Sequence, residues 1–213
     1  MTSLLLIRHG ESRANREGFF AGQADVPLEE KGLSQARITA DFIVRNYSVD
    51  RVYASDLCRA YDTGKAVADL LGLEVIPDPR LREIFSGKWQ GQKFTDIIAQ
   101  YGEDYQVWLT DIGNCVCTGG ESVAQLGQRV LAALTDIATE NPGKTVVIAT
   151  HATPIRVLQC LLGGFALNRM KDIPWVSNAS VTEITYDAGV WMLGKIGQDA
   201  HLFDLKTTFC ANV

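Results

Sequence analysis

The first residues of the chain hold the feature that most constrains its fold. Residues 4–7 (Leu-Leu-Leu-Ile) are apolar and are followed at once by residues 8–11 (Arg-His-Gly-Glu). A short apolar run that ends in charged groups is typical of a buried strand with polar side chains at its carboxyl end. In open α/β sheets, ligands bind at that end of the strands. A single histidine there is more often structural, so this pattern alone assigns no site.

The same pattern returns in the second half of the chain. Residues 146–149 (Val-Val-Ile-Ala) run into His151 and Ala152, and Thr153 with Pro154 is a suitable cap and first-turn pair for a following helix. His151 is therefore expected just ahead of a helix amino terminus. That position favours a neutral imidazole in the empty site and an anion nearby when it is occupied.

Apolar periodicity predicts alternating strands and helices along the rest of the chain. We expect helices within residues 28–47, 56–72, 122–140 and 153–162, and strands at 52–54, 73–76, 145–149, 181–186 and 190–196. Ser55 or Asp56 can cap the second helix, and Ser122 with Gln125 fits a capping box for the third. The last two strands are predicted to form a hairpin. This order predicts an α/β three-layer sandwich, in which helices cover both faces of a mostly parallel sheet with an antiparallel edge.

Two stretches are predicted to lie beside the site rather than in the sheet. Residues 13–23 are polar, contain the exposed-looking pair Phe19 and Phe20, and are predicted to form a loop. Residues 89–118 are partly helical and contain five aromatic side chains and an acidic surplus. We interpret them as a small cap inserted within a single domain that spans residues 1–213, and we expect half or more of these aromatics to pack the insertion against the domain.

Arg59 and Glu83 are candidate site residues whose positions leave two interpretations open. Arg59 falls in or next to the first turn of a predicted helix, where the helix dipole disfavours a cation. It either tolerates a small cost at the surface or binds an anion. Glu83 ends the run Arg-Leu-Arg-Glu and, taken alone, fits a solvated charge run equally well.

Charge and apolar content argue against several classes of partner. The formal net charge of -5 argues against nonspecific binding to nucleic acid or to an anionic membrane. No apolar stretch is long enough to span a bilayer. Because Arg8 ends the first apolar run after a few residues, we expect no signal peptide.

The cysteines predict a reducing compartment. The chain has five cysteines at scattered spacings: Cys58, Cys115, Cys117, Cys160 and Cys210. An odd, scattered set is typical of free thiols, so we expect a cytoplasmic protein. The Cys115 and Cys117 pair is spaced too closely for a usual zinc site, and no second pair or nearby histidine completes one, so we expect two loop thiols.

Six short motifs follow one another in the order found in a known family. They are Arg-His-Gly-Glu-Ser at 8–12, Asp-Val-Pro-Leu at 25–28, Ser-Asp-Leu at 55–57, Leu-Arg-Glu at 81–83, Gly-Gly-Glu-Ser at 119–122 and Thr-His at 150–151. With them the chain resembles the histidine phosphatase superfamily, in the branch of cofactor-dependent phosphoglycerate mutases and their phosphatase relatives. Ala152 departs from the pattern, since the family usually has glycine there. Its methyl is tolerated if only the backbone N–H is used and crowds the site if the chain approaches the ligand closely.

The resemblance implies a role for each matching residue. His9 would accept a phosphoryl group, which Arg8, Arg59 and His151 would hold. Glu83 would protonate the leaving oxygen and then deprotonate the water that hydrolyses phosphohistidine. Asn15 matches a family phosphate contact, and Glu11, Gly22, Gln23 and Ala152 are further candidate substrate-binding residues. A neutral imidazole is nucleophilic without a metal, so we expect neither a metal nor a cofactor.

The fate of phosphohistidine separates the two activities of this branch. The mutases carry basic residues in a longer insertion, whereas residues 89–118 contain Lys93 and an acidic surplus. We therefore expect hydrolysis of a small phosphorylated metabolite. The aromatic cap suggests an apolar or aromatic leaving group. Phosphoglycerate mutase is the alternative, and the physiological substrate and a homodimer stay open.

Two functions of other classes are weighed against these. A catalytically inactive phosphate-binding protein is disfavoured because His9, His151, Arg8, Arg59 and Glu83 are all present. A metal-dependent hydrolase is disfavoured because the chain has three histidines and none forms ligand spacing with carboxylates.

Overall fold

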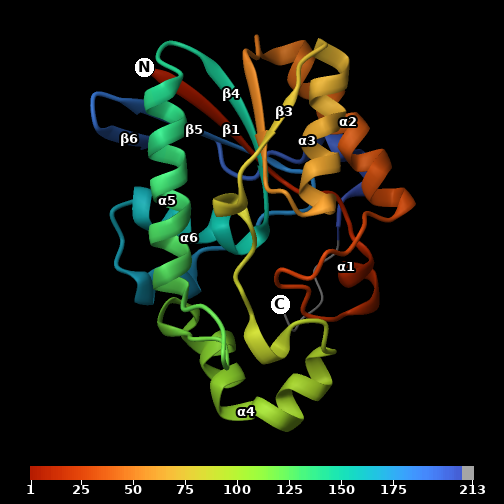
Figure 1. Ribbon diagram of the computed structural model, residues 1–213, viewed down its shortest axis with the longest axis vertical. Helices are drawn as coiled ribbons and strands as arrows, with labels where there is room; N and C mark the ends of the chain where they lie inside the picture. Colours follow the sequence, from red (N-terminus) through yellow and green to blue (C-terminus); the bar gives the residue numbers. More distant parts are fainter. Residues whose placement is uncertain (208–213) are drawn as a thin grey trace.

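The first apolar run forms the central strand of a mixed sheet. In the computed structural model, which describes residues 1–207, six strands pair in the order β3-β2-β4-β1-β5-β6 (Figure 1). They are β1 (Thr2–Arg8), β2 (Arg51–Ala54), β3 (Val75–Pro77), β4 (Thr145–Thr150), β5 (Val181–Asp187) and β6 (Val190–Leu193). Strands β3, β2, β4 and β1 are parallel, whereas β5 and β6 are antiparallel to their neighbours. The predicted mostly parallel sheet with an antiparallel edge is confirmed.

Alternate residues of β1 enter two different cores. Leu4 and Leu6 pack with apolar residues of α5 (Val123–Glu140) and α6 (Ala152–Leu162). Leu5 and Ile7 pack with α2 (Glu30–Asn46) and α3 (Cys58–Leu71). Because successive side chains of a strand point to opposite faces, the two clusters are the two interfaces of a three-layer sandwich. Figure 1 shows α5 and α6 on one side of the sheet, and α2 and α3 on the other.

Several local signals fix the ends of elements as the sequence predicts. Helix α3 ends at Gly72, which has φ of 64°. Ser122 and Gln125 form the predicted capping box of α5. Strands β5 and β6 form the predicted hairpin, and its turn places Ala188 and Gly189 at φ of 47° and 89°.

Three local predictions are wrong. The stretch 13–23 is not all loop, because α1 (Arg13–Glu17) forms there. Neither Ser55 nor Asp56 is the residue that caps α3. Instead the backbone N–H of Cys58 donates to Asp25 Oδ1 at 2.8 Å. Helix α6 begins at Ala152 rather than at the Thr153 and Pro154 pair, so His151 is its N-cap residue.

The segment after β3 extends beyond the carboxyl ends of the parallel strands. Within residues 1–207 it contains the short 3₁₀ helices Pro79–Leu81, Gly87–Trp89 and Ile112–Asn114, and the kinked helix α4 (Phe94–Thr110), which Figure 1 places at the far end of the molecule from the amino terminus. Two further 3₁₀ helices follow α6 and β6, at Leu167–Asp172 and Ala200–Leu205.

Cys115 and Cys117 lie in the loop after α4 and are buried. The cysteines at 58, 115, 117 and 160 are unpaired, and Cys210 lies outside the described residues. No helix within residues 1–207 combines the length and the apolar character that crossing a membrane would require.

Candidate active site

Two neighbouring parallel strands bring both histidines to one place. Arg8 of β1 is in register with Thr150 of β4, so His9 and His151 leave adjacent strand ends. Their ring centroids lie 5.2 Å apart at an interplanar angle of 64°. Both side chains are buried. Two residues separated by most of the chain therefore form one imidazole pair.

The hydrogen bond of His9 fixes which ring nitrogen is available. His9 Nδ1 lies 2.7 Å from the carbonyl oxygen of Gly10. Because a carbonyl only accepts, Nδ1 carries the proton and the lone pair of a neutral ring is on Nε2. Burial, followed by the charges of Arg59 and Arg8, holds the pKa of His9 well below its usual 6.5. The free site therefore presents a neutral, nucleophilic imidazole.

Arg59 comes from the first turn of α3 and is buried. Its Nη1 donates to Ala24 O at 2.8 Å and its Nη2 to Gly22 O at 2.7 Å. Gly22 has φ of 51°, and a Cβ there would lie 2.2 Å from Ser86 Oγ, so this position requires glycine. The two loop carbonyls accept from the Nη atoms, whereas Arg59 Nε has no hydrogen-bond partner among residues 1–207.

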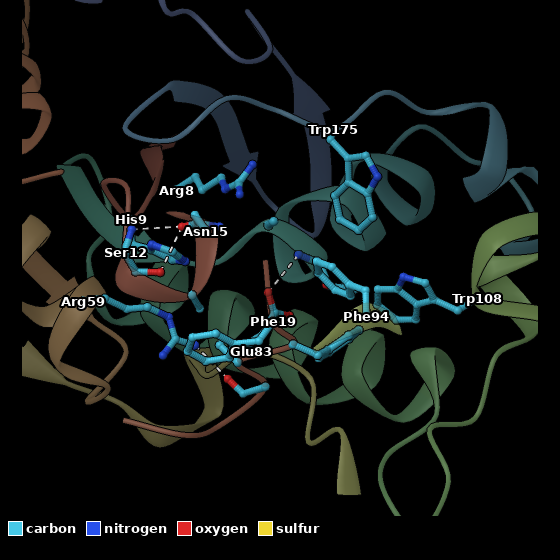
Figure 2. Close-up of a pocket in the computed structure, with 16 residues that line it drawn as sticks. Arg8, His9, Ser12, Asn15, Phe19, Arg59, Glu83, Phe94, Trp108 and Trp175 are labelled. Carbon is cyan, nitrogen blue, oxygen red and sulfur yellow. Dashed lines mark hydrogen bonds between the residues drawn. The ribbon is translucent and has the colours of Figure 1, made fainter. Parts of the chain in front are cut away.

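Arg8 is the second cation of the site. Its side chain is buried and its Nη1 donates to Val176 O at 2.6 Å. Burial lowers its pKa to about 10, so it stays charged at neutral pH. Arg8 and Arg59 both line the same pocket as His9 (Figure 2).

The amide of Asn15 is oriented by three donors. Asn15 Oδ1 accepts from Ser12 N and Ser12 Oγ, both at 3.0 Å, and from Asn178 Nδ2 at 3.4 Å. Because the oxygen is occupied, the NH₂ group is the end left to donate into the pocket. Asn178, which the sequence analysis did not identify, also donates to His9 O at 2.8 Å.

Backbone donors hold the carboxylate of Glu83 at the amino terminus of α6. Glu83 Oε1 accepts from Ile84 N at 2.8 Å, and Oε2 accepts from Thr153 N at 3.3 Å. Gln23 Nε2 and Arg129 Nη2 both donate to Glu83 O, at 3.1 and 3.2 Å. The helix terminus and these contacts place the carboxylate in the pocket lining beside the arginines.

His151 lies behind this cluster as the N-cap residue of α6. Its Nε2 lies 2.9 Å from Ser55 Oγ, and its Nδ1 has no partner among residues 1–207. Burial, followed by the charge of Arg59, holds the pKa of His151 well below its usual 6.5. His151 is therefore neutral in the free site, as expected for an empty pocket at a helix terminus.

A cavity of about 90 Å³ joins these groups to a set of aromatic side chains. Sixteen residues line it: Arg8, His9, Ser12, Ala14, Asn15, Phe19, Phe20, Ala21, Gly22, Arg59, Glu83, Phe94, Trp108, Ala152, Thr153 and Trp175. Seven of the ten predicted site residues are among them. Ala152 is one of the seven, at the first position of α6.

The other three predicted residues lie outside the lining, and the roles assigned to all ten stay predictions. His151 contacts His9 from behind, and Gln23 holds the backbone of Glu83. Glu11 forms an ion pair with Lys31 at 2.9 Å.

The aromatic side chains divide between pocket and packing. Of the five in residues 89–118, Phe94 and Trp108 line the cavity. Trp89 and Tyr105 are buried against one another, with ring centroids 5.5 Å apart. Phe20 was expected to be exposed but is buried. Trp175, which the sequence analysis did not identify, completes the lining from the segment before β5.

Potential metal ligands are scattered in the described part of the chain. Within residues 1–207, no three His, Cys, Asp or Glu side chains come together in a way that could hold a metal ion.

Comparison with known proteins finds relatives that match the chain over most of its length. The chain is 32% identical over 95% of both chains to phosphoserine phosphatase 1 from Hydrogenobacter thermophilus. It is 29% identical, again over 95% of both chains, to a probable phosphoglycerate mutase, GpmB, from Yersinia pestis. The solved structure of YhfR from Bacillus stearothermophilus superposes with a TM-score of 0.91 at 28% identity, covering 95% of this chain and 100% of that one. A family model described as histidine phosphatase superfamily (branch 1) matches residues 4–199, and the chain therefore belongs to that superfamily.

Proposed function

We propose that the protein is a metal-independent phosphomonoester hydrolase that works through a phosphohistidine on His9. The observation that carries the proposal is the hydrogen bond from His9 Nδ1 to Gly10 O at 2.7 Å, which leaves Nε2 as the free lone pair. Two buried arginines line the same cavity and can compensate the charge of a phosphoryl group. A nucleophile and its charge compensation are thus combined without a metal.

The first step transfers the phosphoryl group to the protein. The Nε2 lone pair of His9 forms a bond to phosphorus while the bond from phosphorus to the leaving oxygen breaks. Glu83 gives its proton to that oxygen. Arg8, Arg59 and the NH₂ group of Asn15 hold the phosphoryl oxygens, and His151 adds a charged donor when the negative charge of the bound phosphate raises its pKa and it takes up a proton from solvent.

The second step releases inorganic phosphate. Water attacks the phosphorus, Glu83 takes the proton of that water, and the bond from nitrogen to phosphorus breaks. His9 returns to its neutral form. Glu83 therefore alternates between acid and base, and the backbone donors Ile84 N and Thr153 N keep its oxygens in place for both steps.

The pocket favours hydrolysis over phosphoglycerate mutation. A mutase must hold a second anionic group on its substrate. Among the residues that line the cavity, the basic side chains other than histidine are Arg8 and Arg59, which already serve the phosphoryl group. Five of the other lining side chains are aromatic. The relatives include both a phosphoserine phosphatase and a probable phosphoglycerate mutase, so family membership alone does not separate the two activities.

Release of phosphate from an aryl phosphate in the presence of a chelator tests this function. The wild-type protein is expected to stay active in chelator, and His9→Ala is expected to fall to background. His201→Gln is the matched control, because that histidine stacks on Phe42 outside the pocket. Acid-labile labelling of the wild-type protein during turnover, absent from His9→Ala, would identify the phosphohistidine.

Two outcomes would contradict the proposal. Loss of activity in chelator that added metal restores would show a metal-dependent hydrolase. Absence of phosphate release by the wild-type protein as well as by His9→Ala would favour a mutase or a phosphate-binding protein. Phosphoglycerate isomerisation would be measured next.

A further inference from the structure

The lining of the cavity is divided into a polar end and an apolar end. Charged and hydrogen-bonding side chains gather around His9, Arg8 and Arg59. Phe94, Trp108 and Trp175 lie at the opposite end, as Figure 2 shows, and Phe19 and Phe20 also line the cavity. A phosphomonoester with its phosphate at His9 must place its leaving group toward this aromatic end.

Trp175 is held in place from its outer side by a buried cation. The guanidinium of Arg156, a residue of α6, lies 4.2 Å from the centroid of the Trp175 ring. Arg156 Nε donates to Ile173 O at 2.7 Å, and Nη2 donates to Lys171 O at 3.3 Å. The side chain thus ties the segment that carries Trp175 to α6 and at the same time covers one face of its ring.

Trp108 is fixed from a different direction. Its ring lies 5.1 Å from Phe20 and 6.2 Å from Trp89, both in edge-to-face arrangements, and it is buried. The rings of Trp108 and Trp175 lie 6.3 Å apart with an interplanar angle of 30°. Two rings anchored by separate elements therefore form one wall that needs little ordering when a ligand binds.

We propose that Trp175, together with Trp108, selects monophosphates whose leaving group is flat, apolar and uncharged. The inference rests on the proposed function for the phosphate end and adds the class of leaving group. A flat apolar group gains stacking and burial against the two rings. A charged or polyhydroxylated group loses its water there, and the charged side chains that line the cavity, Arg8, Arg59 and Glu83, lie at the other end. Arg156 is a positioning residue, because it acts through the Trp175 ring.

Binding of non-hydrolysable phosphonates tests the selectivity without relying on turnover. Dissociation constants for benzylphosphonate, cyclohexylmethylphosphonate and ethylphosphonate are measured by calorimetry. The wild-type protein is expected to bind benzylphosphonate about 10- to 100-fold more tightly than ethylphosphonate, from ring burial and stacking. Cyclohexylmethylphosphonate, whose ring is puckered, is expected to have a dissociation constant between those of the other two. 2-Amino-4-phosphonobutanoate, the non-hydrolysable analogue of O-phosphoserine with a charged group in place of the ring, is expected to bind more weakly than benzylphosphonate.

Variants distinguish the contribution of the aromatic side chains to ligand preference from a general loss of structure. Trp175→Ala is expected to reduce the benzyl-to-ethyl preference to within a few fold, and Trp175→Phe to keep most of it. Arg156→Met keeps an apolar side chain but removes the guanidinium. It should reduce the benzyl-to-ethyl preference to a value between those of the wild-type protein and Trp175→Ala. Trp191→Ala is the matched control, since Trp191 packs on Tyr186 at 4.6 Å and does not line the cavity.

Equal binding of the benzyl, cyclohexylmethyl and ethyl phosphonates by the wild-type protein would overturn the inference, as would an unchanged preference in a folded Trp175→Ala protein. Failure of the proposed function is distinguishable from both. In that case phosphate release from benzyl phosphate is absent or metal-dependent, while the phosphonate preferences still report on Trp175.

Discussion

At the scale of single residues, Glu83 illustrates how position alone supports a chemical role. Its two carboxylate oxygens accept from two different backbone N–H groups, one of them at the amino terminus of α6. These backbone contacts hold the side chain in the pocket lining. The carboxylate is therefore available to exchange a proton with the leaving oxygen and with water.

Glu83→Gln keeps the shape of the side chain but removes the exchangeable proton. We expect turnover to fall by about 10² to 10⁴ for a substrate with a poor leaving group, and much less for an activated aryl phosphate, whose leaving group needs no proton. The rates for an alkyl phosphate and for a nitrophenyl phosphate are compared in both proteins. Equal losses with the two substrates would remove Glu83 from the acid role.

Residues that could be predicted from sequence are those whose local context already points to the site. Arg8 and His9 directly follow a buried apolar run, and Arg59 lies in the first turn of a helix. Asn178 and Trp175 carry no such signal, because their partners are remote in the chain. Asn178 lies 163 positions from Asn15, to which it donates. Only the antiparallel pairing of β5 with β1 brings that segment beside His9.

At the scale of elements, helix α3 is the part whose start matters most to the site. Its first backbone N–H, that of Cys58, donates to Asp25 Oδ1 at 2.8 Å, and Arg59 is the next residue. The side chain that caps this helix thus comes from the same loop that offers Gly22 O and Ala24 O to Arg59. The cap and Arg59, the proposed phosphate ligand, are therefore positioned together.

Asp25→Ala removes this cap. We expect a loss of about 1 kcal/mol in the free energy of unfolding and a raised KM, because Arg59 loses its fixed starting turn. Asp25→Asn should keep the free energy of unfolding and the KM close to the wild-type values, since asparagine also caps helices. Urea unfolding and steady-state kinetics measure the two effects. Asp69→Ala is the control near the other end of α3, where an exposed ion pair with Lys65 contributes little. An unchanged KM in a destabilised Asp25→Ala protein would show that the cap does not position Arg59.

Element boundaries were predictable where the signal is local and were missed where a distant group competes. Gly72 and the pair Ser122 and Gln125 end and begin helices as expected, because each acts on its own turn. Ser55 was expected to be a cap, but its hydroxyl instead bonds to His151, which lies 96 positions away. The predicted N-cap of α6, Thr153, was late by two residues for a related reason, since the strand end itself supplies the N-cap residue His151.

At the scale of the whole molecule, the two site histidines make stability depend on pH. Burial, and next the charge of Arg59, depress the pKa values of His9 and His151 well below the 6.5 of an unfolded chain. Below about pH 6.5 the unfolded chain therefore binds more protons than the folded one. Folded-state stability is fully present above that pH and is lost as the pH falls, by at most about 1.4 kcal/mol per pH unit for each histidine.

Urea unfolding at pH 7.5, 6.5 and 5.5 in a phosphate-free buffer measures this dependence. The wild-type protein is expected to lose stability as the pH falls through this range. His151→Gln is expected to show a shallower loss, because one of the groups that take up a proton on unfolding is gone. An identical slope in the two proteins would show that His151 does not titrate on unfolding in this window.

The central place of β1 has a consequence for how the chain can be made. Leu4 pairs with Val146 on one side and with Ile184 on the other, so β1 is synthesised before either of the strands that pair with it. Contacts between such remote segments form slowly, because a long loop must close first. A nascent chain that has emerged only as far as β3 contains His9, Arg8 and Arg59, but neither of the strands that pair with β1. Assembly of this molecule is therefore a late event, and the apolar first strand needs protection until β4 and β5 have emerged.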